Sequence, residues 1–306
     1  MTTPLRVAVT GSAGKIGREA ARALKAAGHR VIGLDLRAAT NDGVRTAAVD
    51  CADFGAVMGA LSGIDTMFGM APLPQVPDAV VHLAGIPAPG LADDARIFEV
   101  NTLSTYNVFS ACARLGIKRI AWGSSETILG LPFATPPAFL PIDETHADRP
   151  NWSYAMAKFL GEQMADHMTR WHADLSIASL RFSNVFDAAD YAQQAAAAAR
   201  PGFRKFNVWG YVDARDAGEA CRLAVEADFT GHERLIIAAA DNITGHSSAA
   251  LAAAHYPETP IKSALEGDVS LLCSARAKAV IGYEPKHGWR AGVHDLGQER
   301  QADHAN

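Results

Sequence analysis

Short apolar runs alternate with longer segments of helical period through the first 180 residues. Residues 15–27 show apolar positions at the spacing of one helix face. Runs rich in β-branched or other apolar residues, typical of buried strands, occupy residues 6–10, 31–34, 79–83, 119–122 and 175–180. Consecutive parallel strands need a crossover long enough to hold a helix. The alternation therefore predicts a doubly wound α/β fold, in which helices cover both faces of a parallel sheet.

The pattern becomes irregular beyond residue 180. Residues 195–199 are consecutive alanines, a favourable helix sequence, and residues 257–288 are rich in proline and glycine, as in loops and short elements. We expect residues 1–180 to form the main domain, with about 208–240 returning to it, and 181–306 to form a smaller substrate-binding region. Residues 66–77, with two Met, one Phe and three Pro, break the rhythm. We interpret them as a surface loop; a flap or an oligomer contact is the alternative.

Composition narrows the class of protein. Of 306 residues 49% are hydrophobic, and 28 Lys and Arg against 33 Asp and Glu give a net charge of −5. This balance argues against a basic nucleic-acid surface and against disorder. No window has the roughly 18 apolar residues of a membrane span, and the first strand follows directly on a short start without leader features. We expect a cytoplasmic protein. The four scattered cysteines fit small buried hydrophobes, and no metal is expected.

A glycine-rich turn follows the first strand and opens the first helix. Its sequence is Gly11-Ser-Ala-Gly14-Lys-Ile-Gly17. Such a turn lets a pyrophosphate approach the backbone and aims helix N-terminal amides at it. The second strand ends in Asp35, 18 positions after Gly17, where a carboxylate can accept hydrogen bonds from the ribose hydroxyls and repel a 2′-phosphate. NAD is therefore favoured over NADP, although Arg37 leaves NADP open.

The expected cofactor contacts extend beyond this turn. Small residues after the strand at 79–83 let the backbone approach the dinucleotide, and the segment after the third strand can contact adenine. The full set is Gly11, Ala13, Gly14, Lys15, Ile16, Gly17, Asp35, Leu36, Asp50, Cys51, Leu83, Ala84, Gly85, Tyr154 and Lys158.

Tyr154 and Lys158 lie four residues apart, on one face of a predicted helix. The pair alone is a weak motif, but Ser124-Ser125 follows a strand at the sheet edge where doubly wound folds bind ligands. A nearby ammonium and a positively charged nicotinamide both favour a phenolate, so we expect the pKa of Tyr154 to lie well below its usual value of about 10. Lys158 is expected to hold the nicotinamide ribose as well, and Ser125 to bond the reacting oxygen of the substrate.

Together these motifs resemble the extended short-chain dehydrogenases/reductases, the NAD-dependent epimerase/dehydratase family. They are the glycine turn, His82-Leu-Ala-Gly85, Asn101 in Val-Asn-Thr-Leu-Ser-Thr-Tyr-Asn-Val, Ser125 five residues before Gly130, Tyr154-x-x-x-Lys158 and Arg181-x-x-Asn184-Val. The resemblance implies catalytic Ser125, Tyr154 and Lys158, with Asn101 as a structural or proton-relay residue. We expect substrate contacts from Ser124, Ser125, Asn184 and Arg181. The resemblance also implies a homodimer through the helices that carry Asn101 and Tyr154.

Departures from the family pattern bear on the substrate. Nucleotide-sugar epimerases of this family commonly carry two arginines that clamp the diphosphate, and the matching residues here are Trp209 and Leu265. Apolar side chains cannot make bidentate bonds to phosphate. Asn184-Val-Phe-Asp187 and Leu129 depart from the usual pattern as well. A small sugar-like or hydroxy-acid substrate therefore fits better, as in the uronate dehydrogenase branch.

Three functions remain open on the sequence. The first is an NAD-dependent dehydrogenase of a secondary alcohol, with Arg181, Arg204, Lys205 and Arg215 as candidate contacts for a substrate carboxylate, although surface or structural roles are commoner for such residues. The alternative is an epimerase or dehydratase that retains NAD, since Glu126 beside Ser125 could serve in dehydration. A non-enzymatic NAD-binding sensor is disfavoured because the Ser-Tyr-Lys triad is intact.

Overall fold

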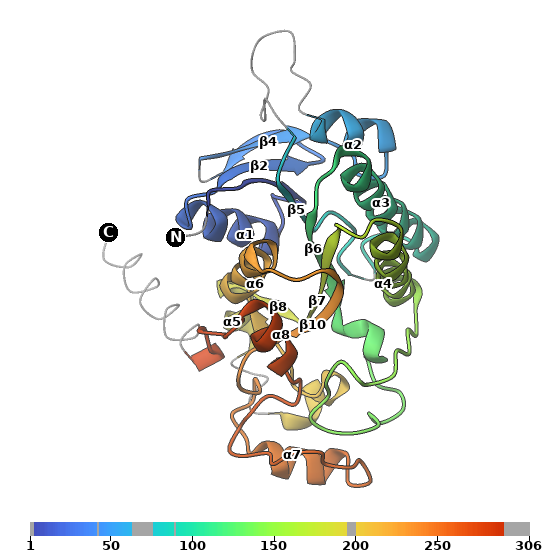
Figure 1. Ribbon diagram of the computed structural model, residues 1–306. Coiled ribbons are helices and arrows are strands. Elements are labelled where there is room, and N and C mark those ends of the chain that lie inside the picture. The colour runs from blue at the N-terminus through green and yellow to red at the C-terminus, as the bar shows by residue number, and fades with distance from the viewer. Residues whose placement is uncertain (1–2, 42, 63–75, 89, 195–199, 291–306) are drawn as a thin grey trace, which may run out of the picture.

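The computed structural model describes residues 3–41, 43–62, 76–88, 90–194 and 200–290 (Figure 1). The strands are β1 (Arg6–Thr10), β2 (Arg30–Asp35), β3 (Ala39–Asn41), β4 (Val44–Ala48), β5 (Ala79–His82), β6 (Arg119–Ser125), β7 (Ser176–Phe182), β8 (Val185–Phe186), β9 (Val212–Asp213) and β10 (Gly231–Ile237). The helices are α1 (Lys15–Ala26), α2 (Phe54–Leu61), α3 (Asp94–Leu115), α4 (Ser153–Trp171), α5 (Ala188–Gln194), α6 (Ala214–Glu226), α7 (Ser248–His255) and α8 (Ala275–Ile281), with 3₁₀ turns η1 (Glu126–Leu129) and η2 (Pro201–Asn207). The interpretations of residues 66–75 and 195–199 fall outside the described residues.

The main sheet has the strand order β10-β7-β6-β5-β1-β2-β4-β3. All neighbours in it pair in parallel except β3, a three-residue edge strand antiparallel to β4. The chain builds outward from β1 to β2 and β4 on one side, then returns to β5 and builds outward through β6 and β7 on the other. This confirms the predicted doubly wound fold. The strand order reverses at β1 and β5, where such folds leave a crevice.

Helices pack on both faces of this sheet, with α1 and α6 on one side and α3 and α4 on the other (Figure 1). Successive side chains of a strand point to opposite faces. In β1, Val7 and Val9 accordingly join the core beneath α1 and α6, whereas Ala8 joins Val80 and Ile120 beneath α3 and α4. Both faces of these strands are buried, which is why they read as continuous apolar runs.

The position of α4 on the sheet depends on a glycine. A Cβ atom added at Gly161 of α4 would lie 2.3 Å from the ring of Trp122 in β6. The missing side chain therefore lets α4 lie close to β6 in a register that brings its first turn to the carboxyl end of that strand.

A third apolar cluster, containing Trp209, Tyr211 and Leu271, lies beyond the carboxyl end of β10. It joins α7 and the loops around it to the main sheet. α6 packs against α1, and β10 pairs with β7. The division at residue 180 stays a prediction. None of the helices in the described residues is long and apolar enough to span a membrane.

Candidate active site

A cleft of about 1070 Å³ opens at the carboxyl ends of the central strands. Its walls come from the turn after β1, the ends of β2, β4, β5 and β6, the start of α4 and the segment after β7. All fifteen residues expected to contact the cofactor line it: Gly11, Ala13, Gly14, Lys15, Ile16, Gly17, Asp35, Leu36, Asp50, Cys51, Leu83, Ala84, Gly85, Tyr154 and Lys158. The fold thus gathers at one place residues that are up to 147 positions apart in the chain, from Gly11 to Lys158.

The glycine turn has no room for side chains where the sequence predicts a bound anion. Gly11 has a φ of +66°, and a Cβ there would lie 2.8 Å from the backbone N of Ala84. A Cβ on Gly17 would lie 2.1 Å from the carbonyl oxygen of Gly11. Gly14 caps α1 without a side-chain hydrogen bond, so the first amides of the helix remain for a ligand. This cradle fits a pyrophosphate.

Asp35 is held at the end of β2 by the glycine turn itself. Its carboxylate accepts hydrogen bonds from the backbone N–H of Ala13 at 3.0 Å and of Leu36 at 2.8 Å. A carboxylate fixed in this way fits a diol and repels a phosphate. The residues present therefore fit NAD at this end of the cleft.

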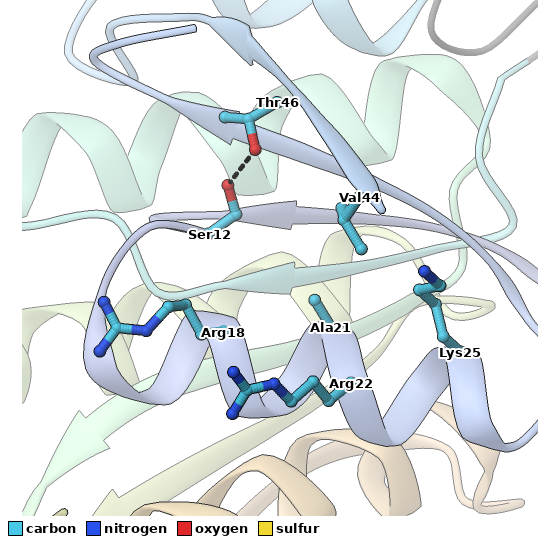
Figure 2. A pocket seen from close by; sticks show the side chains of 7 residues that line it. All are labelled: Ser12, Arg18, Ala21, Arg22, Lys25, Val44 and Thr46. Carbon is cyan, nitrogen blue, oxygen red and sulfur yellow. Dashed lines mark hydrogen bonds between the residues drawn. The ribbon is translucent and has the colours of Figure 1, made fainter. Parts of the chain in front are cut away.

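Three basic residues of α1 line a hollow apart from the cleft. Arg18, Arg22 and Lys25 extend along α1 into a separate small hollow, where the hydroxyl of Ser12 meets that of Thr46 at 3.1 Å (Figure 2). They line that hollow, whereas Asp35 lines the cleft.

The ends of β1 and β5 are tied together by Thr10. Its hydroxyl oxygen accepts the backbone N–H groups of Leu83 and Ala84, both at 3.1 Å, and meets Nδ1 of His82 at 2.7 Å. Because the oxygen accepts two bonds, its own hydrogen is donated to Nδ1. Burial lowers the pKa of His82 to about 3, so the ring is neutral and structural.

Ser125, Tyr154 and Lys158 all line the deep middle of the cleft. Lys158 donates to the carbonyl of Gly123 at 2.5 Å, with its Nζ 5.6 Å from the centre of the Tyr154 ring. Trp152 stacks on that ring at 5.2 Å. The Oγ of Ser125 accepts two bonds from Thr127, at 3.2 Å from its N–H and 3.0 Å from its hydroxyl. The hydrogen of the Ser125 hydroxyl is thereby left to donate toward the Tyr154 phenol, whose pKa this contact lowers.

The low pKa expected for Tyr154 requires the bound nicotinamide and stays a prediction. Burial raises the pKa of Tyr154 to about 12, the Ser125 hydroxyl opposes this, and the charge of Glu126 adds to it. Burial also lowers the pKa of Lys158 to about 8. The sequence shows the i, i+4 spacing, but it does not show how far the two groups are removed from water.

Two predicted substrate contacts are structural instead. Arg181 is fully buried, and its guanidinium pairs with Glu162 at 2.6 Å and Asp148 at 2.8 Å. Ser124 lines the cleft, but its hydroxyl donates to Glu162 at 2.6 Å. The two side chains meet a buried carboxylate on α4, because Arg181 and Ser124 are register partners on neighbouring strands. Arg181 does not line the cleft, and the hydroxyl hydrogen of Ser124 is already donated to Glu162.

Asn101 lies behind the cleft wall. Its side-chain oxygen accepts from the N–H of Ile86 at 2.7 Å, and its side-chain nitrogen donates to the carbonyl of the same residue at 3.1 Å. Asn101 therefore clamps the loop after β5, which matches the structural one of its two expected roles.

The far end of the cleft holds polar groups that sequence reasoning left out or saw only in part. Asn184 accepts from Arg204 at 2.8 Å and from Asn207 at 2.9 Å, and Asn207 also reaches Glu126 at 3.3 Å. Burial raises the pKa of Glu126 to about 7, while Ser183, Asn207 and Arg204 act to lower it. Asn207 stands in no motif, so no local signal could have found it.

The remaining candidates for a carboxylate contact lie away from the cleft lining. Arg204 is buried behind Asn184, with its guanidinium 5.2 Å from the centre of the Phe186 ring. Arg215 pairs with Asp213 at 2.9 Å, and Lys205 is exposed. Trp209 is fully buried against Tyr256, 6.0 Å between ring centres.

Cys51 lies in the cleft wall. Burial raises the pKa of Cys51 to about 12, which keeps its thiol protonated in the cleft wall. Within the part of the chain that the structure describes, no group of three or more His, Cys, Asp or Glu side chains is arranged to hold a metal ion.

The chain is similar in sequence and in fold to known proteins. The model of the NAD dependent epimerase/dehydratase family matches residues 7–238. The L-arabinose 1-dehydrogenase (NAD(P)(+)) of Haloferax volcanii is 31% identical over 184 residues, covering 58% of this chain and 65% of that protein. The UDP-glucose 4-epimerase of Bacillus subtilis is 26% identical over 192 residues, 60% of this chain and 54% of that protein. These matches thus span less than two thirds of either relative.

Among solved structures, a short-chain dehydrogenase/reductase superfamily protein from Agrobacterium tumefaciens with bound NAD superposes with a TM-score of 0.69. The two chains are 23% identical, and the superposition covers 98% of each. At this identity the likeness shows a common fold.

Proposed function

The chain belongs to the NAD-dependent epimerase/dehydratase family, and we propose that within it the protein is a dehydrogenase of a small, free sugar-like or hydroxy-acid substrate. As a member of that family it is an NAD-dependent enzyme of the oxidoreductase and epimerase type. The proposal concerns the substrate class, the exchange of NAD with solvent and the roles of Ser125, Tyr154 and Lys158.

In the proposed reaction a secondary alcohol becomes a carbonyl. NAD, when bound, supplies the hydride acceptor. Ser125 donates its hydroxyl hydrogen to the reacting oxygen and fixes the place of that oxygen, and Tyr154 takes the hydroxyl proton at Oη. The phenol must lose its own proton first, so the positive charges of Lys158 and of the bound cofactor have to lower a pKa that burial sets at about 12.

The main support for a free, non-nucleotide substrate is that the two positions expected to hold diphosphate-binding arginines hold other residues. Trp209 and Leu265, at the two positions where the resemblance implies arginines, are apolar and do not line the cleft. Lys15, which lines it, is paired with Asp187 at 3.4 Å and with Asp190. Likeness to an L-arabinose 1-dehydrogenase agrees with a free sugar.

A dehydrogenase screen tests the proposal. Purified protein is given aldoses, uronates, aldonates and polyols with NAD and NADP in parallel, and absorbance at the nicotinamide band is followed. We expect steady reduction of NAD in large excess over enzyme, and a much lower kcat/KM with NADP. No reduction with any substrate, or turnover independent of added NAD, would contradict the proposal.

The alternative is an epimerase or dehydratase that retains its NAD. Likeness to a UDP-glucose 4-epimerase and the Glu126 carboxyl beside Ser125 favour it. Calorimetry with UDP-glucose separates the two: binding at micromolar concentration supports the epimerase, and we expect none.

We also infer a homodimer. Four large apolar side chains are exposed on the neighbouring helices α3 and α4, namely Phe98, Leu103, Tyr106 and Met156. A single exposed apolar residue is ordinary, but a group on two adjacent helices indicates an interface. Light scattering on the wild type and on Leu103→Glu tests this; we expect a dimer that the substitution weakens.

A further inference from the structure

Unpartnered buried polar atoms gather at the far end of the cleft. In the described residues eight buried side-chain N or O atoms have no hydrogen-bond partner, and four of them belong to Glu126, Ser183, Arg204 and Asn207. Contacts through Asn184 and Asn207 link Glu126, Arg204 and Asn207, and the Ser183 hydroxyl acts on Glu126 as well. Leaving a buried polar group without a partner costs about 1–3 kcal/mol, so the cluster indicates a site built for a ligand.

The unpartnered atoms differ in what they require. The Oε2 of Glu126 and the Oδ1 of Asn207 are acceptors, the Nε of Arg204 is a donor, and the Oγ of Ser183 can be either. A carboxylate or phosphate offers acceptors alone and would leave the two acceptor atoms unsatisfied. Glu126, Ser183 and Asn207 line the cleft, whereas Arg204 does not. A hydroxyl group can donate to one of these acceptors and accept from Ser183, so it fits the three atoms that a ligand can reach.

The cluster also has a fixed place relative to the reacting atoms. Glu126 follows Ser125 directly, and its charge raises the pKa of Tyr154. Glu126, Ser183 and Asn207 line the cleft, while Arg204 lies behind them. A group held by Glu126 therefore sits next to the atom that Ser125 and Tyr154 hold.

We propose that Glu126 and Asn207 form a subsite for the hydroxyl group vicinal to the reacting carbon, and that Glu126 determines specificity for it. The inference rests on the proposed dehydrogenase function and deepens it. The substrate class becomes a sugar or polyol with a hydroxyl on the carbon next to the one that is oxidised.

The electrostatic surroundings agree with this assignment. Arg204 on η2 and Tyr154 on α4 are the charged or titratable groups that act with Glu126. With its pKa near 7, the carboxyl is mostly ionised at pH 8 and accepts a strong bond from a hydroxyl.

A cycle of enzyme and substrate changes tests the subsite at pH 8 with NAD. The substrates are D-galactose and 2-deoxy-D-galactose, which lacks the hydroxyl next to C1, and the enzymes are the wild type and Glu126→Ala. A hydrogen bond to a charged group contributes about 1.5–3 kcal/mol, so we expect a roughly 10- to 100-fold higher kcat/KM for galactose in the wild type. In Glu126→Ala this ratio should fall to about threefold or less. An equal ratio in both enzymes overturns the proposal.

Two additions keep every outcome informative. Glu126→Gln preserves the shape and an acceptor without the charge, so it should fold and should show roughly the square root of the wild-type ratio, because a charge-assisted bond is about twice as strong as a neutral one. If no substrate is turned over, the proposed function fails, and calorimetry of both sugars on the NAD-loaded proteins decides the subsite alone. A wild-type preference for galactose that Glu126→Ala loses supports it; equal affinity, or no binding of either sugar, overturns it.

Discussion

Replacement of Glu162 by glutamine tests how the active-site strand is held. Glu162 on α4 is completely buried, and its carboxylate accepts from Ser124 at 2.6 Å, from Arg181 at 2.9 and 2.6 Å, and from Arg234 at 2.9 Å. Glutamine keeps the shape but removes the charge and turns one acceptor into a donor. Within the described residues, Arg181 then keeps Asp148 as its remaining ionic partner.

The expected loss of stability follows from burial. Breaking a buried ion pair by removing one partner costs about 3–5 kcal/mol, because the other charge stays in the interior. Glu99→Gln is the matched control: its pair with Arg96 at 2.9 Å is half-exposed on both sides, and such pairs contribute about 0–1 kcal/mol. Urea unfolding of both variants measures the two values. A loss below about 1 kcal/mol in Glu162→Gln would refute the reasoning.

The effect has a pH dependence of known sign. The arginine and serine contacts outweigh burial and lower the pKa of Glu162. A carboxyl with a depressed native pKa stabilises the protein above its unfolded pKa of about 4.3, and that stability is lost as the pH falls through the native value. The difference between wild type and Glu162→Gln should therefore be constant near neutrality and should shrink in acid.

Other substitutions test separate parts of the site. Tyr154→Phe should lower kcat by about 10²- to 10⁴-fold, while fluorescence titration shows unchanged NADH affinity. Lys15→Met removes the pairs that tie the glycine turn to Asp187 and Asp190, so NADH should leave the cleft up to about fivefold faster in stopped-flow measurements. High salt should speed release from the wild type in the same way, because it screens these pairs. Equal release rates in the two proteins would contradict this. Burial raises the pKa of Glu126 to about 7, so the folded protein holds this proton more tightly than the unfolded chain does. As the pH rises from about 4.5 to 7, the wild type should therefore lose about 3 kcal/mol of unfolding free energy relative to Glu126→Gln. Urea unfolding at several pH values in this range measures the difference.

The sheet and the cofactor end of the cleft could be predicted because their signals are local. A buried parallel strand shows as an apolar run, and the glycine turn needs its three glycines within seven residues, where a Cβ would meet backbone. Asp35 follows from the end of the next strand. Neighbouring strands carry such ends to one edge, so knowing the fold class is enough to place them together.

The roles of Arg181 and Ser124 could not be predicted in the same way. A strand pattern says which residues share a face, but it does not say which helix residue meets them. Glu162 lies 19 positions before Arg181 in the chain and reaches it because Gly161 lets α4 approach Trp122. The motif that contains Arg181 therefore predicts a substrate contact in the cleft, whereas the packing of α4 turns the Arg181 side chain toward Glu162 in the interior.

Long-range packing also explains why the chemistry at the far end of the cleft could be predicted only in part. Adjacency to Ser125 was enough to single out Glu126, but its chemistry depends on Asn207, 81 positions later, and on the Arg204 guanidinium behind it. These distant segments bury the Glu126 carboxyl, which raises its pKa to about 7 and leaves its Oε2 without a hydrogen-bond partner. Local sequence thus determines where hydride and proton transfer can occur, and long-range packing determines which neighbouring group the substrate must carry.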